Sequence, residues 1–286
     1  MPDSSDLKAV LTELPLKDAY NDLIHPAASA VGQTLSLPFR AVNVLLAPLT
    51  KWVLQGEEKL NAVSQLVAEK VADVPREKLV PPEPYVAVPA MQAISYSLDN
   101  SELRDLYANL LAKAINTDTR QLVHPAYVEM IKQMSPLDAL LLRQIKVKAL
   151  SSLALCDVRW QEKAAPLSTH LPTFRFIRNG IDLMTNLISI SMPGVDAGDL
   201  STSIENLARL RLVELDRQRC LIDEEEYVYF EHCPAVDSLR GTDYSYRLIP
   251  EENKTPDEYE LALLKGLCLV TNLGAQFSDI CVSDPE

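Results

Sequence analysis

The spacing of apolar residues changes within SPLDALLLRQIKVKALSSLALCDVRWQE, residues 135–162. In its first part, apolar residues recur at intervals of three and four, which predicts a helix with one buried face: Leu137, Leu140, Leu141 and Ile145. After residue 148, apolar residues stand among polar ones in a pattern typical of a strand: Leu153, Leu155, Val158 and Trp160. We therefore expect a mostly helical α+β protein, with a helical domain over residues 1–147 and an α+β domain over residues 148–286.

The acids and the histidine around this stretch have an architectural interpretation. Ser135 is a typical N-cap before Pro136, and Asp138 falls in the same first turn. His124 lies just before an earlier helix start, and Glu129 follows it by five residues, which does not place both on one helical face. No other histidine lies nearby in the sequence. We expect His124 to act in capping or loop packing, and not in catalysis or metal binding.

The segment 37–54 is apolar on more than one face. Phe39, Val42, Leu46, Leu49 and Val53 recur at helical spacing, and Trp52 lies near the end of the segment. Such a helix is either buried, in the core or against a partner protein, or inserted into a membrane after some trigger. These six side chains are therefore the candidate partner-facing or membrane-facing residues. The segment is too short to span a bilayer.

A proline-rich connector is expected near residues 80–90, because four prolines in nine residues disfavour a helix. Beyond it, DNSELRDLYANLLAKAIN, residues 99–116, predicts a helix with capping-box spacing between Asp99 and Glu102. Together with the helices of residues 122–147, this makes the first half helical.

The second half predicts alternating helices and strands. A helix over residues 200–212 precedes a strand over 213–216, an acidic helix is expected over 223–239, and an apolar strand over 266–270 precedes a last helix. This alternation of helices and strands, which ends in a strand followed by a helix, is typical of a winged-helix-like α+β domain.

Composition excludes several classes of function. The chain has 286 residues, 47% of them hydrophobic, and a formal net charge of −13, which disfavours general binding to nucleic acid. Its five cysteines show no CxxC pair, which predicts reduced thiols in a cytoplasmic protein. No nucleotide-binding or nucleophile motif occurs. We expect no catalytic residue, no cofactor and no metal.

Several stretches resemble one known family. The sequences NVLLAPL (43–49), GEEKL (56–60), VPPEPYVAVPAMQAISYSL (80–98), ELRDLYANLLAKAIN (102–116) and LVHPAYVEMIKQMSP (122–136) are similar to the Abi-alpha family, named for abortive infection. SIENLARLRLVEL (203–215) and LVTNLGAQFSDICV (269–282) continue the likeness. Where such relatives often have glycine after the helix, this chain has Arg211.

The resemblance implies a bacterial cytosolic protein associated with phage defence, without catalytic residues to transfer. Two hypotheses follow. The first is a non-enzymatic defence protein that acts on another protein, by self-association, or on a membrane after a trigger. The second is a regulator that binds DNA through the winged-helix-like domain. The helix at 200–212 carries Arg209 and Arg211, but neighbouring acids offset them, so nucleic acid is not the expected partner.

Overall fold

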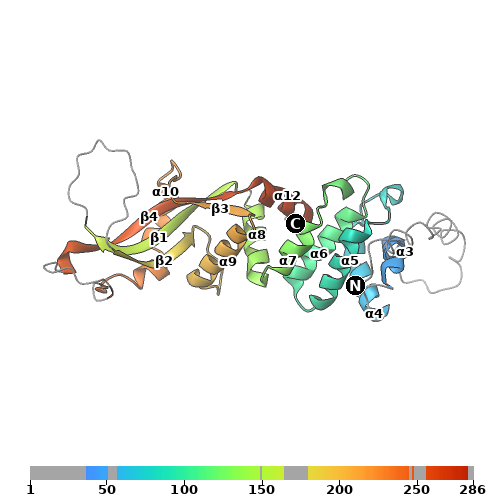
Figure 1. The fold of residues 1–286 in the computed structure, drawn as a ribbon, viewed down its shortest axis with the longest axis horizontal. Helices are drawn as coiled ribbons and strands as arrows, with labels where there is room; N and C mark the ends of the chain where they lie inside the picture. Colours follow the sequence, from blue (N-terminus) through green and yellow to red (C-terminus); the bar gives the residue numbers. More distant parts are fainter. Residues whose placement is uncertain are drawn as a thin grey trace, which may run out of the picture.

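Most helices of the first half of the chain, with the C-terminal helix, lie toward one end of an elongated molecule, and the sheet lies toward the other end with the remaining helices beside it (Figure 1). In this computed structural model the described residues are 37–50, 57–148, 150–163, 180–244, 247 and 256–282. The helices are α3 (Leu37–Thr50), α4 (Glu57–Lys70), α5 (Pro84–Tyr96), α6 (Ser101–Ala114), α7 (Ala126–Lys132), α8 (Pro136–Val147), α9 (Ala197–Arg209), α10 (Glu225–Glu231), α11 (Pro234–Asp237) and α12 (Asn272–Cys281). The strands are β1 (Ser152–Glu162), β2 (Gly180–Ile188), β3 (Val213–Asp216) and β4 (Tyr259–Val270). The α+β class is confirmed.

The four strands form one antiparallel sheet in the order β2-β1-β4-β3. Its centre is the long pair β1 and β4, which stays in register from Ser152 opposite Leu269 to Glu162 opposite Tyr259. The sheet comes from residues beyond 147, as the change of apolar spacing predicts.

The winged-helix arrangement is not confirmed. The last strand begins at Tyr259 and not near residue 266, and β2 lies in a stretch whose spacing mixes helical and strand-like signals. The acidic helix expected over 223–239 is divided into α10 and α11, because Pro234 has no N–H for continued helical hydrogen bonding.

The proline connector is shorter than expected. Residues 80–83 are not helical, and the backbone N–H of Val80 donates to the carbonyl of Ile115 at 2.8 Å. However, Pro84 begins α5 as a first-turn proline, a position that needs no N–H donor. Pro89 lies inside the same helix. The expectation of extended chain up to residue 90 is therefore wrong from residue 84 onward.

The sheet separates two hydrophobic cores, because alternate residues of β1 face opposite sides. Leu153 and Leu155 join the large core that also contains the helices α3 to α9 and α12. Ala154, Cys156 and Val158 join a smaller core covered by α10 and α11. This double burial explains why β1 is apolar on both faces.

The C-terminal helix α12 returns to the helical end. Lys146 Nζ in α8 donates to the carbonyl oxygens of Ser278 at 3.1 Å and Val282 at 2.7 Å, which places a cation at the helix C-terminus. Asn109 Nδ2 in α6 donates to the Cys281 carbonyl at 2.8 Å. The large core thus includes residues on both sides of position 147, and the division into domains at that position stays a prediction.

Candidate functional site

The apolar helix α3 is packed into the large core. Phe39, Val42 and Leu46 are buried, and the helix packs on α4 and α5. The side chain of Leu49 and the residues Trp52 and Val53 lie outside the described residues. Among the helices that the structure describes, none is both long enough and apolar enough to cross a membrane. The structure thus places three of the six candidate residues, and it places them against the rest of the protein.

His124 lies in the loop just before α7. Its Nδ1 accepts a hydrogen bond from the backbone N–H of Ala126 at 3.1 Å, and its ring lies 6.0 Å from the ring of Tyr127. Glu129 pairs with Lys132 at 2.7 Å instead of with His124. Within the described residues no group of three histidine, cysteine or acidic side chains could hold a metal ion. The N-cap position of α7 is Pro125, so His124 is not the N-cap itself; its contacts are local ones in the loop before the helix.

Asp138 is a buried link between two helices. It forms a capping box with Ser135, whose N–H donates to Asp138 Oδ2 at 2.6 Å. From α9, Ser203 Oγ donates to Oδ1 at 2.7 Å and Asn206 Nδ2 donates to Oδ2 at 2.7 Å. The carboxylate therefore joins α8 to α9, and its hydrogen bonds point to a structural role.

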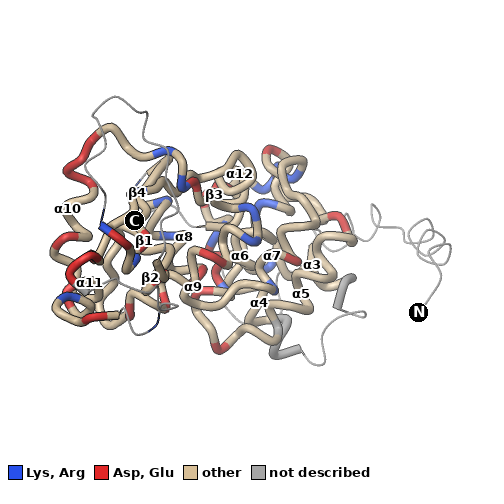
Figure 2. Tube along the Cα trace, turned by 60° about the vertical axis from the view of Figure 1, so that its left-hand side comes forward, with Lys and Arg blue, Asp and Glu red and all other residues tan. Residues whose placement is uncertain are grey.

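An acidic surface with exposed apolar side chains lies at the opposite end of the molecule from α5. It occupies α10 and the loop before it, where acidic residues gather along the trace (Figure 2). We define the acidic face as Ile222, Asp223, Glu224, Glu225, Glu226, Val228 and Tyr229. Ile222 is fully exposed, Val228 is 45% exposed and Tyr229 is 36% exposed. Apolar groups in water within a charged rim are typical of a protein-binding surface.

Helical spacing explains how the exposed residues share one side of α10. Val228 and Tyr229 follow Glu225 by three and four residues, so these three lie on the outer side of the helix. Tyr227 and Phe230 lie on the inner side and are buried in the small core against β1. The helix is thus held by its inner residues while its outer residues remain available.

Tyr227 fixes α10 and the preceding loop to the sheet. Its hydroxyl donates to the carbonyl of Gly266 in β4 at 2.6 Å and accepts from the backbone N–H of Leu221 at 2.9 Å. Burial raises the pKa of the Tyr227 hydroxyl, so this group remains a donor at neutral pH. Lys265 Nζ lies 5.0 Å from the centre of the Tyr227 ring, a cation–π contact.

One cation pairs with the rim of the face. Lys265 Nζ lies 2.7 Å from Glu224, and this hydrogen bond raises the pKa of the Lys265 ammonium group. Glu225 and Glu226 belong to the same run of acids, Asp223 to Glu226. Because like charges at this spacing repel one another, the face is favourable for a cationic ligand and unfavourable for phosphates.

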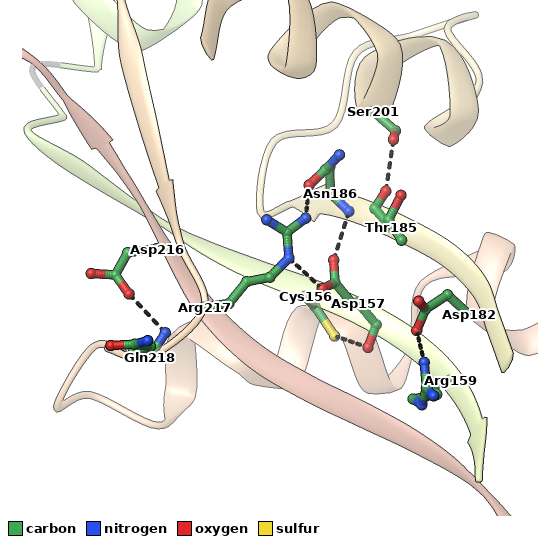
Figure 3. A network of polar contacts seen from close by, with 10 residues as sticks. All are labelled: Cys156, Asp157, Arg159, Asp182, Thr185, Asn186, Ser201, Asp216, Arg217 and Gln218. Atoms are coloured by element: carbon green, nitrogen blue, oxygen red, sulfur yellow. Dashed lines mark hydrogen bonds and ion pairs between the residues drawn. The ribbon is translucent and has the colours of Figure 1, made fainter. Parts of the chain in front are cut away.

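The loop that leads to the acidic face is anchored by a buried polar network (Figure 3). Arg217, just after β3, points across β4, and its Nε donates to Asp157 Oδ2 of β1 at 2.8 Å. Its guanidinium also donates to the side-chain oxygen of Asn186 in β2. Gly266 makes room for this crossing, since a Cβ there would lie 2.9 Å from the carbonyl oxygen of Asp216.

The same network explains an irregularity in the sheet. The pairing of β1 with β2 shifts register on both sides of Val158. Asn186 has a positive φ of 57°, a conformation that asparagine adopts more readily than most residues. Its backbone N–H donates to Asp157 Oδ1 at 2.9 Å, so the buried Asp157 carboxylate accepts from the neighbouring strand β2 and from Arg217 in the loop after β3. The network is structural support for the loop, because the Asp157 carboxylate accepts from the charged guanidinium of Arg217 and from a backbone N–H.

The acidic face is not a site that the sequence singles out. The run DEEE, residues 223–226, has the default interpretation of a solvated charged surface. The signal that could have found it is the spacing of Val228 and Tyr229 after Glu225, next to buried Tyr227 and Phe230, because it gives a short helix two apolar sides.

Comparisons with known proteins give one family. A search of curated proteins found no match, and neither did a search of solved structures. The family model described as abortive infection alpha matches residues 55–281. This match spans most of the chain, from just before α4 to the end of α12. The chain therefore belongs to the abortive infection alpha family.

Proposed function

We propose that this chain is a non-enzymatic phage-defence protein that acts by binding a basic segment of another protein through its acidic face. Membership of the abortive infection alpha family supports the defence role. The observation that carries the binding mode is the fully exposed Ile222 beside the run of acids, together with the exposed Val228 and Tyr229. A cytoplasmic location is part of the proposal.

The chemistry of the partner follows from the face. Burial of Ile222 and Val228 by apolar side chains of a partner would supply favourable free energy, while the acids would attract and orient lysine or arginine side chains around them. Tyr229 adds a large, rigid side chain of the type enriched at binding surfaces. A segment with an apolar side and a basic side, such as a basic amphipathic helix, has both features.

The alternative, a DNA-binding regulator, has less support. Arg209 in α9 donates to Asn206 at 2.9 Å and to Gln133 at 2.8 Å, and Arg217 is held by Asp157. Arg211 occupies the turn after α9. Two of these three arginines are thus held by hydrogen bonds within the chain, and the acidic face would repel phosphates.

Membrane action by α3 remains a second mode of the same defence role. It requires a trigger that removes Phe39, Val42 and Leu46 from the core in which they are buried. Leakage of anionic liposomes by the purified chain, alone and after addition of infected-cell extract, tests this mode, with Leu46→Glu as the variant that weakens insertion. Leakage without a requirement for Leu46 would contradict it.

The proposal is tested by phage challenge of cells that carry the wild-type gene or a variant of the acidic face. Ile222→Asp and Val228→Asp are expected to lose protection at an unchanged protein level, because each places another acid where a partner would bury an apolar group. Val147→Asp is the matched control, since Val147 at the end of α8 is 41% exposed. Full protection by both face variants would overturn the proposed binding mode.

Binding itself is measured with a defined probe. A fluorescent amphipathic helical peptide of lysine and leucine is expected to bind the wild-type chain, more weakly at high salt, and to lose affinity for Val228→Asp. A peptide of the same pattern with glutamate in place of lysine should not bind. Equal binding of both peptides would show that the acids play no part.

A further inference from the structure

A second exposed surface differs from the acidic face because it carries no charge. Helix α5 contains neither acidic nor basic residues over its whole length, Pro84–Tyr96. Its outward side consists of residues at intervals of three and four, which we call the tyrosine stripe: the exposed Tyr85, Gln92 and Tyr96 and the half-buried Val88 and Pro89. Tyr85 is 62% exposed and Tyr96 is 86% exposed. The opposite side of α5 is buried in the large core.

Four of the five residues of the stripe are placed symmetrically about its centre, and Val88 has no counterpart. Tyr85 and Tyr96 stand at its two ends, eleven residues apart and therefore close to the same angle around the helix axis. Pro89 and Gln92 lie at equal distances from the midpoint. If two such helices pack antiparallel, Tyr85 of one lies beside Tyr96 of the other, and Pro89 lies beside Gln92. A surface that matches its own copy in this way suits a two-fold interface.

The distribution of charge favours contact between two copies of this chain at the tyrosine stripe over contact at the acidic end. Two chains of net charge −13 repel each other, and most of the negative charge lies in residues 149–286. Those residues include the acidic face, which lies toward the other end of the elongated molecule from α5 (Figures 1 and 2). Contact through the uncharged stripe therefore brings the copies together while the acidic ends stay apart.

Helix dipoles also favour an antiparallel pair. Arg120 pairs with Glu83 beside the start of α5, and Asp99 is exposed just beyond its end. Antiparallel packing sets the two helix dipoles in opposite directions and places the neutral Arg120–Glu83 pair of one copy toward Asp99 of the other. A helix of this length extends over only about 20 Å, so the interface is small and the association is of the weak, reversible class.

We infer that two copies of this chain associate through antiparallel packing of their α5 helices along the tyrosine stripe. The inference does not depend on the partner of the acidic face, because it uses a different surface. It assigns self-association to the helical end and leaves the sheet end of each copy exposed.

Sedimentation velocity of the full chain at about 5 to 200 μM tests the association in the range suited to a small interface. The wild-type chain is expected to shift from monomer toward dimer, and Tyr96→Asp and Tyr85→Asp should remain monomeric at every concentration. Tyr229→Asp, an exposed tyrosine of the acidic face, is the matched control and should dimerise as the wild type does. A wild-type chain that stays monomeric throughout overturns the inference.

The antiparallel geometry has its own test. In a Cys220→Ser background, which removes the exposed cysteine, Gln92→Cys should be cross-linked to dimer by a short bismaleimide. Gln218→Cys, near the other end of the molecule, should not be. Equal cross-linking at both positions would show non-specific encounters and would overturn the assignment to α5. Circular dichroism of each variant shows that a loss of dimer does not come from unfolding.

Discussion

The hydroxyl of Tyr227 lies 2.6 Å from the carbonyl oxygen of Gly266, and this hydrogen bond ties the helix that bears the acidic face to the central strand β4. Gly266 is also the residue over which Arg217 crosses to reach Asp157. One position in β4 therefore supports both the helix and the loop of the face. The face is exposed, but its base is held by buried polar contacts.

Tyr227→Phe should lower the free energy of unfolding by about 1–2 kcal/mol, because the Gly266 carbonyl and the Leu221 N–H both lose a partner. Urea unfolding at neutral pH measures the change. Tyr85→Phe is the control, since that side chain is 62% exposed and should give a change near zero. An equal effect of both substitutions would show that the hydroxyl of Tyr227 does not anchor the face.

Arg211→Gly should stabilise the protein by about 1 kcal/mol, because Arg211 has a φ of 64°, where a Cβ is unfavourable. The turn is a Schellman motif: the N–H of Leu212 donates to Leu207 at 3.0 Å and that of Arg211 to Ala208 at 2.9 Å. Thermal unfolding measures the gain. Arg211→Ala is the control and should give no comparable gain, since alanine keeps the Cβ.

This turn shows what the sequence could predict and what it could not. The sequence predicts a helix followed by a strand here, but the helix expected over residues 200–212 ends at Arg209, and the positive φ of Arg211 is seen only in the structure. The start of α8 at Ser135 and Pro136 was predicted correctly because capping depends on neighbouring residues, whereas the cap expected at Asp99 is Asn100 in the structure. By contrast, the hydrogen bonds from Arg217 to Asp157, 60 residues apart, and from Lys146 to Val282, 136 apart, depend on the tertiary fold.

The proline connector was overestimated for a local reason. Proline disfavours a helix through its missing N–H, but a first-turn position such as that of Pro84 needs none. Pro89 costs one hydrogen bond, which burial of the other side of α5 offsets. The acidic face was missed because exposure of Ile222 and Val228 is a property of the folded chain and not of their spacing alone.

Asp216→Asn should reduce the acid sensitivity of the protein. Hydrogen bonds from the Arg219 side chain, and then from the N–H groups of Gln218 and Arg219, lower the pKa of the Asp216 carboxyl in the folded state. A lowered folded pKa means that the stabilisation is present above the pKa of the unfolded chain, near 4, and is lost as the pH falls through the folded pKa.

Urea unfolding between about pH 7 and pH 3 measures this contribution, as that range includes the ordinary carboxyl pKa. The wild-type chain should lose more stability across the range than Asp216→Asn, and the two curves should converge at the acid end. Glu226 is an exposed acid of the acidic face, and Glu226→Gln should leave the dependence of stability on pH close to that of the wild type. Parallel curves for wild type and Asp216→Asn would contradict the prediction.

Asp138→Ala should destabilise the protein by about 3 kcal/mol or more, because it leaves the hydroxyl of Ser203 and the amide of Asn206 without their buried acceptor and removes half of a capping box. Ser135→Ala removes the cap alone and should cost about 1 kcal/mol. In a double-mutant cycle with Ser203→Ala, the two losses should be less than additive, because both remove the same hydrogen bond. Additive losses in urea unfolding would show that the hydrogen bond between Ser203 and Asp138 contributes nothing to stability.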